Sequence, residues 1–140
     1  MDPLGNLGYE QGNVDMLVLG VAFKYKPATN DIRHTPADPI IKALDTYGSM
    51  DALDPNVERQ KIESLGATPI ARNENEEITD LIQRGGYDII IIANNNQLFL
   101  ELDLFRAREA GGKNTILVDG WGLYSPRTVK RICLEYVDVG

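Results

Sequence analysis

The sequence has few residues of the kinds that cross-link a chain, bind metals or attract nucleic acid. Its 140 residues include one cysteine, Cys133, and one histidine, His34. A single cysteine excludes an internal disulfide and agrees with a reducing compartment. Without a His/Cys cluster, we expect no metal site. Fourteen basic residues against 21 acidic residues give a net charge of −7, which argues against nucleic acid as the main partner.

Long apolar runs are also missing. No segment approaches the ~20 apolar residues that span a membrane. The start, MDPLGNLGYEQGN, lacks the basic and then apolar pattern of a secretory signal. We therefore expect a cytoplasmic protein that does not contact a membrane. Residues 1–13 show no periodicity and are predicted to be a flexible leader, so a single domain is expected to span residues 14–140.

The remainder of the chain alternates between strand and helix patterns. Two nearly continuous apolar runs, MLVLGVAF and YDIIIIA, predict central strands that are covered on both faces. Strands are predicted at 16–23, 49–53, 67–71, 87–93 and 115–119, with a further candidate at 134–139. Helices are predicted between them, including one at 98–110 and a short helix or turn at 127–131. This alternation predicts an α/β fold, a three-layer Rossmann-like open, mostly parallel sheet with helices on both faces.

Polar residues and glycines indicate where these helices begin and end. The first helix has two possible starts, Thr35 followed by proline or Asp38 followed by proline. Asn73 or Asn75 is predicted to cap the helix that ends at the glycine pair 85–86.

Ligands of such sheets bind beyond the carboxyl ends of the strands. Five loops are expected at that edge: 23–35, 54–56, 72–75, 94–98 and 119–126. The first loop carries Lys24, Lys26 and Arg33 against Asp31, a local charge of +2 that leaves −9 for the rest of the chain. Such a loop could focus a small anionic ligand, or it could simply be solvated.

The first loop also carries a recognisable pattern. Residues 20–24 read GVAFK and residues 31–36 read DIRHTP. This block resembles the C-terminal, UDP-binding domain of the UDP-glucose/GDP-mannose dehydrogenase family, whose pattern is roughly Gly-x-Ala-Phe-Lys and then Asp-x-Arg-x-Ser-Pro. Weaker similarity follows at an Asp-Pro pair (54–55), the four-isoleucine strand and a Val-Asp-Gly triplet (118–120). The resemblance covers about residues 14–135.

The resemblance implies a part of an NAD-dependent UDP-sugar 6-dehydrogenase. Enzymes of this family oxidise a primary alcohol of a nucleotide-sugar to a carboxylate and reduce two NAD molecules. Their NAD-binding domain and catalytic cysteine lie upstream of the matched region. This sequence has no Gly-x-Gly-x-x-Gly, and Cys133 reads as a buried apolar residue. We therefore expect no catalytic residue here, no activity from this chain alone, and as partners a UDP-sugar, the remaining domains and, in the full-length enzyme, a homo-oligomer.

The resemblance also implies roles for individual residues. The backbone of Phe23 and the ammonium group of Lys24 would contact the nucleotide-sugar. Arg33 would reach NAD held by another domain, because its planar guanidinium group suits phosphate or ribose oxygens. Asp31 could orient that guanidinium group or cap the turn. His34 has no partner at a motif spacing and is not predicted to be a base.

One position departs from the family pattern. After Val-Asp-Gly the family often has an arginine that binds the nucleotide-sugar, and here that residue is Trp121. Trp121 could stack on a ring and donate one hydrogen bond, but it cannot neutralise a phosphate. Either Lys26 or Arg127 substitutes for the missing cation, or the preferred sugar nucleotide differs.

A different class of function remains open. The alternative is a non-catalytic Rossmann-like module that senses a nucleotide or acts like a receiver domain. Asp54 at a strand end suits a receiver, but the acidic pair that such domains carry after their first strand is absent. The run NNNQ at 94–97 could read sugar or base edges, or it could only form a turn.

Overall fold

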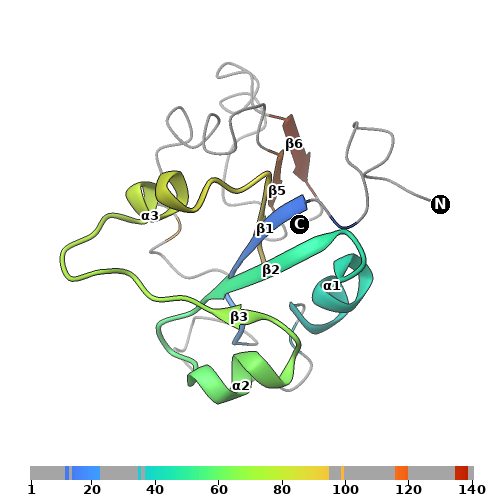
Figure 1. The fold of residues 1–140 in the computed structure, drawn as a ribbon, viewed down its shortest axis with the longest axis horizontal. Coiled ribbons are helices and arrows are strands. Elements are labelled where there is room, and N and C mark those ends of the chain that lie inside the picture. The colour runs from blue at the N-terminus through green and yellow to red at the C-terminus, as the bar shows by residue number, and fades with distance from the viewer. Residues whose placement is uncertain are drawn as a thin grey trace.

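All described strands belong to one parallel sheet (Figure 1). The computed structural model describes residues 12, 14–22, 35, 37–94, 99, 116–119 and 135–138, with the backbone alone for 119 and 135–138. The six strands run in the order β3-β2-β1-β4-β5-β6, and each neighbouring pair is parallel. They are β1 (Val14–Leu19), β2 (Gly48–Leu53), β3 (Thr68–Pro69), β4 (Ile89–Ile92), β5 (Ile116–Asp119) and β6 (Glu135–Asp138). The predicted α/β sheet, including its candidate last strand, is confirmed.

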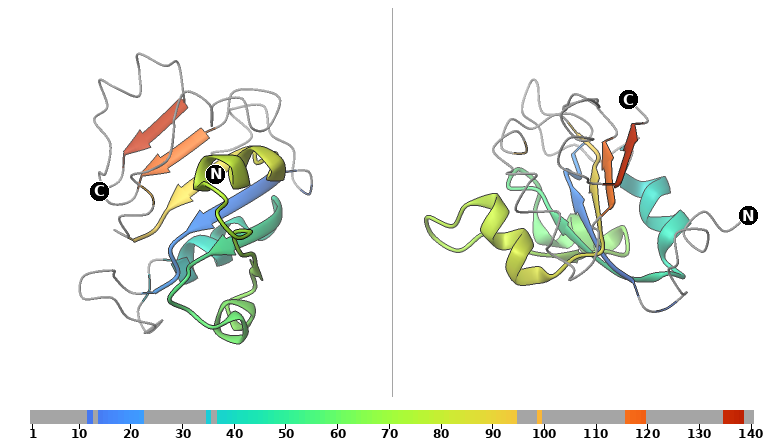
Figure 2. Two further views of the ribbon diagram at one scale, coloured as in Figure 1. Left: turned by 90° about the vertical axis from the view of Figure 1, so that its left-hand side faces the viewer. Right: turned by 90° about the horizontal axis from the view of Figure 1, so that it is seen from above.

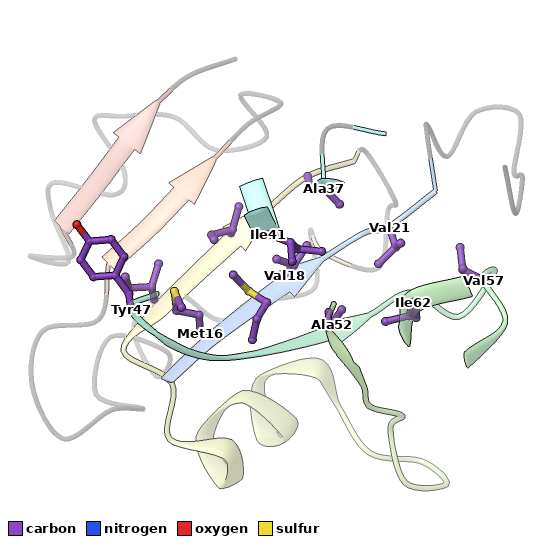
Figure 3. Packing of buried hydrophobic residues seen from close by; sticks show 14 of the residues in the cluster. Met16, Val18, Val21, Ala37, Ile41, Tyr47, Ala52, Val57 and Ile62 are labelled. Atoms are coloured by element: carbon purple, nitrogen blue, oxygen red, sulfur yellow. The ribbon is translucent and has the colours of Figure 1, made fainter. Parts of the chain in front are cut away.

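Three described helices cover the two faces of the sheet: α1 (Ala37–Leu44), α2 (Arg59–Ser64) and α3 (Ile78–Gly85). Ile41 of α1 and Ile62 of α2 pack with Met16 and Val18 of β1 in one core cluster (Figure 3). Residues of α3 pack with Leu17 and Leu19 in a second cluster. Adjacent residues of a strand point to opposite faces, so β1 contributes to both cores. The result is three layers, with α3 on one side of the sheet and α1 on the other (Figure 2).

The isoleucine strand shows why a central parallel strand is apolar at every position. All four residues of β4 are buried. Ile89 and Ile91 belong to the first core cluster, while Ile90 and Ile92 belong to the second. Helices cover both faces of the sheet, so neither side of β4 meets water and the strand shows no alternation.

The structure agrees with one of the two predicted starts of α1 and with the predicted end of α3. Thr35 Oγ1 accepts a hydrogen bond from the backbone N–H of Ala37 at 3.2 Å, so Thr35 caps α1 and the alternative start at Asp38 is wrong. Asp38 lies in the first turn and forms an ion pair with Lys42 at 3.1 Å. Gly86, in the left-handed conformation, ends α3 as predicted.

The predicted cap of α3 is wrong. Its N-cap residue is Glu77, whose side chain makes no capping hydrogen bond. Asn73 lies in a turn instead, where its carbonyl accepts the N–H of Glu76 at 3.0 Å. Asn75 has a positive φ of 61° in the same turn. The side chain of Glu76 closes this turn by accepting the N–H of Asn73 at 2.9 Å.

Other predicted segments lie outside the described residues. These are the helix at 98–110 apart from residue 99, the helix or turn at 127–131, and the leader at 1–13 apart from residue 12. In the described part of the chain, none of the helices combines the length and hydrophobicity of a membrane span.

Candidate functional site

The carboxyl ends of β1, β2 and β4 meet at one edge of the sheet. Gly20, the first residue after β1, donates its N–H to Leu53 O at 2.9 Å. Ala93, the first residue after β4, donates to Leu19 O at the same distance. The segments that follow these three strands are therefore neighbours, as the parallel topology predicts. Of the five predicted loops, 54–56 and 72–75 are described in full.

Asp54 lies at the centre of this edge. Its side chain is buried, with the residue 4% exposed. Oδ2 accepts hydrogen bonds from the backbone N–H groups of Val21 at 2.8 Å and Ala22 at 2.9 Å. Oδ1 accepts the N–H of Asn56 at 2.9 Å. A buried carboxylate is tolerated when donors surround it, and hydrogen bonds to a charged acceptor are stronger than neutral ones.

Asn94 completes the arrangement from the end of β4. It is 1% exposed, and its Nδ2 donates to Asp54 Oδ2 at 3.2 Å and to Ala22 O at 3.4 Å. For Asn94, the structure favours the interpretation as part of a turn, because its side chain is directed at the protein's own backbone. Residues 95–97 of the same run lie outside the described residues.

Gly20 is required beside Asn94. Its φ is +98°, a conformation that residues with a side chain rarely adopt. A Cβ atom at this position would overlap the Asn94 side-chain amide group. The chain therefore leaves β1 at Gly20, which explains why the strand ends at Leu19 although the apolar run continues to residue 23.

The contacts of Asp54 show how the loop after β1 differs from a glycine-rich phosphate loop. In a glycine-rich phosphate loop, the backbone N–H groups after the first strand bind a pyrophosphate. Here two of those N–H groups, from Val21 and Ala22, bind the carboxylate of Asp54 instead. The same contacts argue against a receiver-like role, since a phosphate-accepting aspartate needs an accessible oxygen and Asp54 is buried with both oxygens engaged.

A cleft of about 670 Å³ lies beside this network, between the end of β2 and the segment after β3. Its volume is within the usual range for small-molecule sites. Apolar side chains line it from both segments, with Arg59, Arg72 and Glu74 among its charged residues. Glu76, also on the cleft, accepts hydrogen bonds from the Arg84 guanidinium group at 2.7 and 3.1 Å. This contact holds the pKa of Glu76 below its ordinary value.

The structure leaves the predicted ligand-binding residues untested. Phe23, Lys24, Arg33 and Trp121 all lie outside the described residues, as do Lys26, Asp31, His34, Arg127 and Cys133. The structure adds Gly20, Asp54 and Asn94, whose contacts the sequence did not predict. Two features of the sequence could have indicated these contacts. They are the Asp-Pro pair at 54–55 and the polar run at 94–97, each of which directly follows a predicted strand.

Comparison with known proteins identifies the family. The model of the UDP-glucose/GDP-mannose dehydrogenase family, UDP binding domain, matches residues 17–126. The matched range contains all four predicted ligand-binding residues and the three residues of the buried network. No protein of curated function matches the chain.

Solved structures agree on the fold. An NDP-N-acetyl-D-galactosaminuronic acid dehydrogenase from Methanosarcina mazei Go1 superposes with a TM-score of 0.66 at 20% identity, over 97% of this chain and 26% of that one. An alcohol dehydrogenase superfamily protein from Novosphingobium aromaticivorans superposes with a TM-score of 0.55 at 20% identity, over 99% and 39%. The chain thus spans well under half the length of either protein. With more than half of its residues matched by the family model, the chain belongs to the UDP-glucose/GDP-mannose dehydrogenase family and contains its UDP-binding domain.

Proposed function

We propose that the chain is the UDP-sugar-binding part of an NAD-dependent UDP-sugar 6-dehydrogenase. The reaction of this class converts a primary alcohol of the sugar to a carboxylate and reduces two NAD molecules. The observation that carries the proposal is the family match over residues 17–126, which includes both the GVAFK and the DIRHTP segments. The Rossmann-like sheet, with the first of these segments starting at its carboxyl edge, supports it.

In the proposed division of labour, residues 14–140 provide one wall of the site. The backbone of Phe23 and the ammonium group of Lys24 bind the nucleotide-sugar, and Trp121 contributes a further contact to it. Arg33 contacts NAD held by another domain of the enzyme. The partners are therefore a UDP-sugar, the remaining domains and, in the complete enzyme, further copies of the same chain.

The described residues do not fit a dinucleotide at the usual position. A Rossmann domain binds the pyrophosphate of NAD through the backbone N–H groups after its first strand. The N–H groups of Val21 and Ala22 are hydrogen-bonded to Asp54. This geometry supports the assignment of NAD to another domain.

Titration calorimetry of the 140-residue chain with UDP, UDP-glucose and NAD tests the proposal. We expect weak binding of the uridine nucleotides and no measurable binding of NAD. Lys24→Ala should weaken UDP binding by about 10-fold to 100-fold, the effect of losing one charge-assisted contact. Lys42→Ala is the matched control, because Lys42 is an exposed lysine that forms an ion pair with Asp38 within α1.

Two binding patterns would contradict the proposal, as would a chain that binds no UDP. Binding of NAD alone at ordinary affinity would contradict the division of labour between domains. Binding of UDP that gains nothing from the attached glucose would instead favour the non-catalytic nucleotide sensor, because a dehydrogenase must also recognise the sugar that it oxidises.

A further inference from the structure

We propose that Asp54 and Asn94 are positioning residues of the nucleotide-sugar site. They hold the backbone of residues 20–22 in the conformation from which Phe23 and Lys24 reach the ligand. The inference rests on the proposed function, because it gives a role in that site to two residues that do not themselves contact the ligand.

The first argument is the number of contacts that hold this short segment. Gly20 N–H is bonded to the end of β2, and the N–H groups of Val21 and Ala22 are both bonded to Asp54. The carbonyl of Ala22 accepts from Asn94 at the end of β4. Ala22 is therefore contacted at both its N–H and its C=O, by residues that follow two different strands, β2 and β4.

The second argument is the position of this segment in the chain. Ala22 directly precedes Phe23, and Lys24 follows one residue later. Consecutive Cα atoms are separated by a fixed distance of about 3.8 Å, so the position of Ala22 limits where the next two residues can lie. Val21 and Ala22 are also buried, so the segment has little room to adjust on its own.

The third argument concerns charge. The carboxylate of Asp54 occupies the N–H groups that a phosphate loop offers to its ligand. A ligand phosphate therefore needs donors other than these two N–H groups. Lys24 is the first cation after this segment, and in the proposed site it brings a positive charge to the nucleotide-sugar.

Asp88 provides a matched control for a merely structural effect. It is another buried aspartate, 7% exposed, and its Oδ2 accepts the backbone N–H of Asp15 at 3.0 Å. It precedes β4, whereas Asn94 follows that strand, so it lies at the opposite edge of the sheet. Asp88→Asn therefore removes a comparable buried charge without touching the loop after β1.

The test compares Asp54→Asn with Asp88→Asn in the 140-residue chain. An asparagine offers one acceptor oxygen and brings an NH₂ group, so it cannot accept from Val21, Ala22 and Asn56 together. UDP affinity is measured by calorimetry, and hydrogen exchange of the Val21 and Ala22 amides by NMR. We expect Asp54→Asn to speed this exchange and to weaken UDP binding by about 10-fold to 100-fold. Asp88→Asn should leave both measurements unchanged.

Asn94→Ala keeps the test decisive if Asp54→Asn fails to fold, and Asp54→Gly allows a chemical rescue of the lost contacts. Asn94→Ala retains the carboxylate but removes the contact to Ala22 O, and it should weaken UDP binding to a smaller degree. Formate added to Asp54→Gly supplies a carboxylate to the vacated N–H groups and should restore part of the lost affinity. Formate should not restore affinity to Lys24→Ala.

The possible failures are distinguishable. If UDP affinity survives in Asp54→Asn and Asn94→Ala although exchange at Val21 and Ala22 accelerates, the positioning role is wrong and the proposed function stands. If Asp88→Asn weakens binding as much as Asp54→Asn, the effect is one of general stability, and the positioning role is again wrong. If the unmodified chain binds no UDP, the proposed function fails, and the inference fails with it.

Discussion

Replacing Gly20 with alanine should destabilise the fold more than the same replacement at Gly66. The two glycines have nearly the same φ, +98° and +94°. They differ in what a methyl group would meet. At Gly66 the nearest atom is Ile41 Cγ2 at 3.8 Å, an ordinary contact distance, whereas at Gly20 the Asn94 side chain occupies the space.

The expected magnitudes follow from this comparison. A side chain at such a positive φ costs about 1–3 kcal/mol, and the reduced freedom of the unfolded chain returns about 0.4–1 kcal/mol. Gly66→Ala should therefore lower the free energy of unfolding by about 1–2 kcal/mol. At Gly20 the Asn94 amide must also move away from Asp54 and Ala22, and leaving such buried groups without partners costs about 1–3 kcal/mol more.

Urea unfolding of both single variants measures this difference directly. A double variant, Gly20→Ala with Asn94→Ala, removes the overlap while keeping the strained φ. Its cost should be smaller than the sum of the two single costs, because neighbouring residues couple. Equal costs at Gly20 and Gly66, or strict additivity in the double variant, would refute the close packing of Asn94 against Gly20.

Two predictions concern pH. The hydrogen bond from Arg84 and then that from the Asn73 N–H lower the pKa of Glu76, so its contribution to stability is present above the ordinary value of 4.5 and is lost as pH falls through the lower folded value. The difference in unfolding free energy between the native chain and Glu76→Gln should therefore shrink as pH falls below 4.5. A difference that does not depend on pH would contradict the contact between Glu76 and Arg84. Burial and then the 2.6 Å hydrogen bond to Asp51 raise the pKa of Tyr87, so stability should fall as pH rises above the ordinary value of 10.0. Tyr87→Phe should remove this alkaline loss and cost about 1–2 kcal/mol at neutral pH, and an unchanged alkaline profile would show that Tyr87 is not its source.

Some features of the fold were predictable because they depend on local pattern. Uninterrupted apolar residues at 89–92 indicate a strand covered on both faces, and the structure buries all four. A glycine after the last apolar turn indicates the end of α3 at Gly86. The alternation of strands and helices led to the parallel sheet, and the parallel sheet led to the loops at its carboxyl edge.

The predicted caps failed where a local rule competed with contacts from elsewhere. Asn73 and Asn75 are favourable capping residues, yet they lie in a turn that Glu76 closes. Arg84, from the end of α3, binds Glu76 and so stabilises that turn. A capping rule considers only adjacent residues, whereas Arg84 lies eight positions after Glu76 in the sequence.

By itself, the sequence determined the class of fold, the loops expected at the carboxyl ends of the strands and the family pattern of the loop after the first strand. Each of these depends on the order of residue types along the chain. Only the tertiary structure showed what holds that loop at its start. Asp54 lies 33 residues from Val21, and Asn94 lies 72 residues from Ala22. These groups meet because parallel strands bring their carboxyl ends together, so which donor faces which acceptor depends on packing in three dimensions.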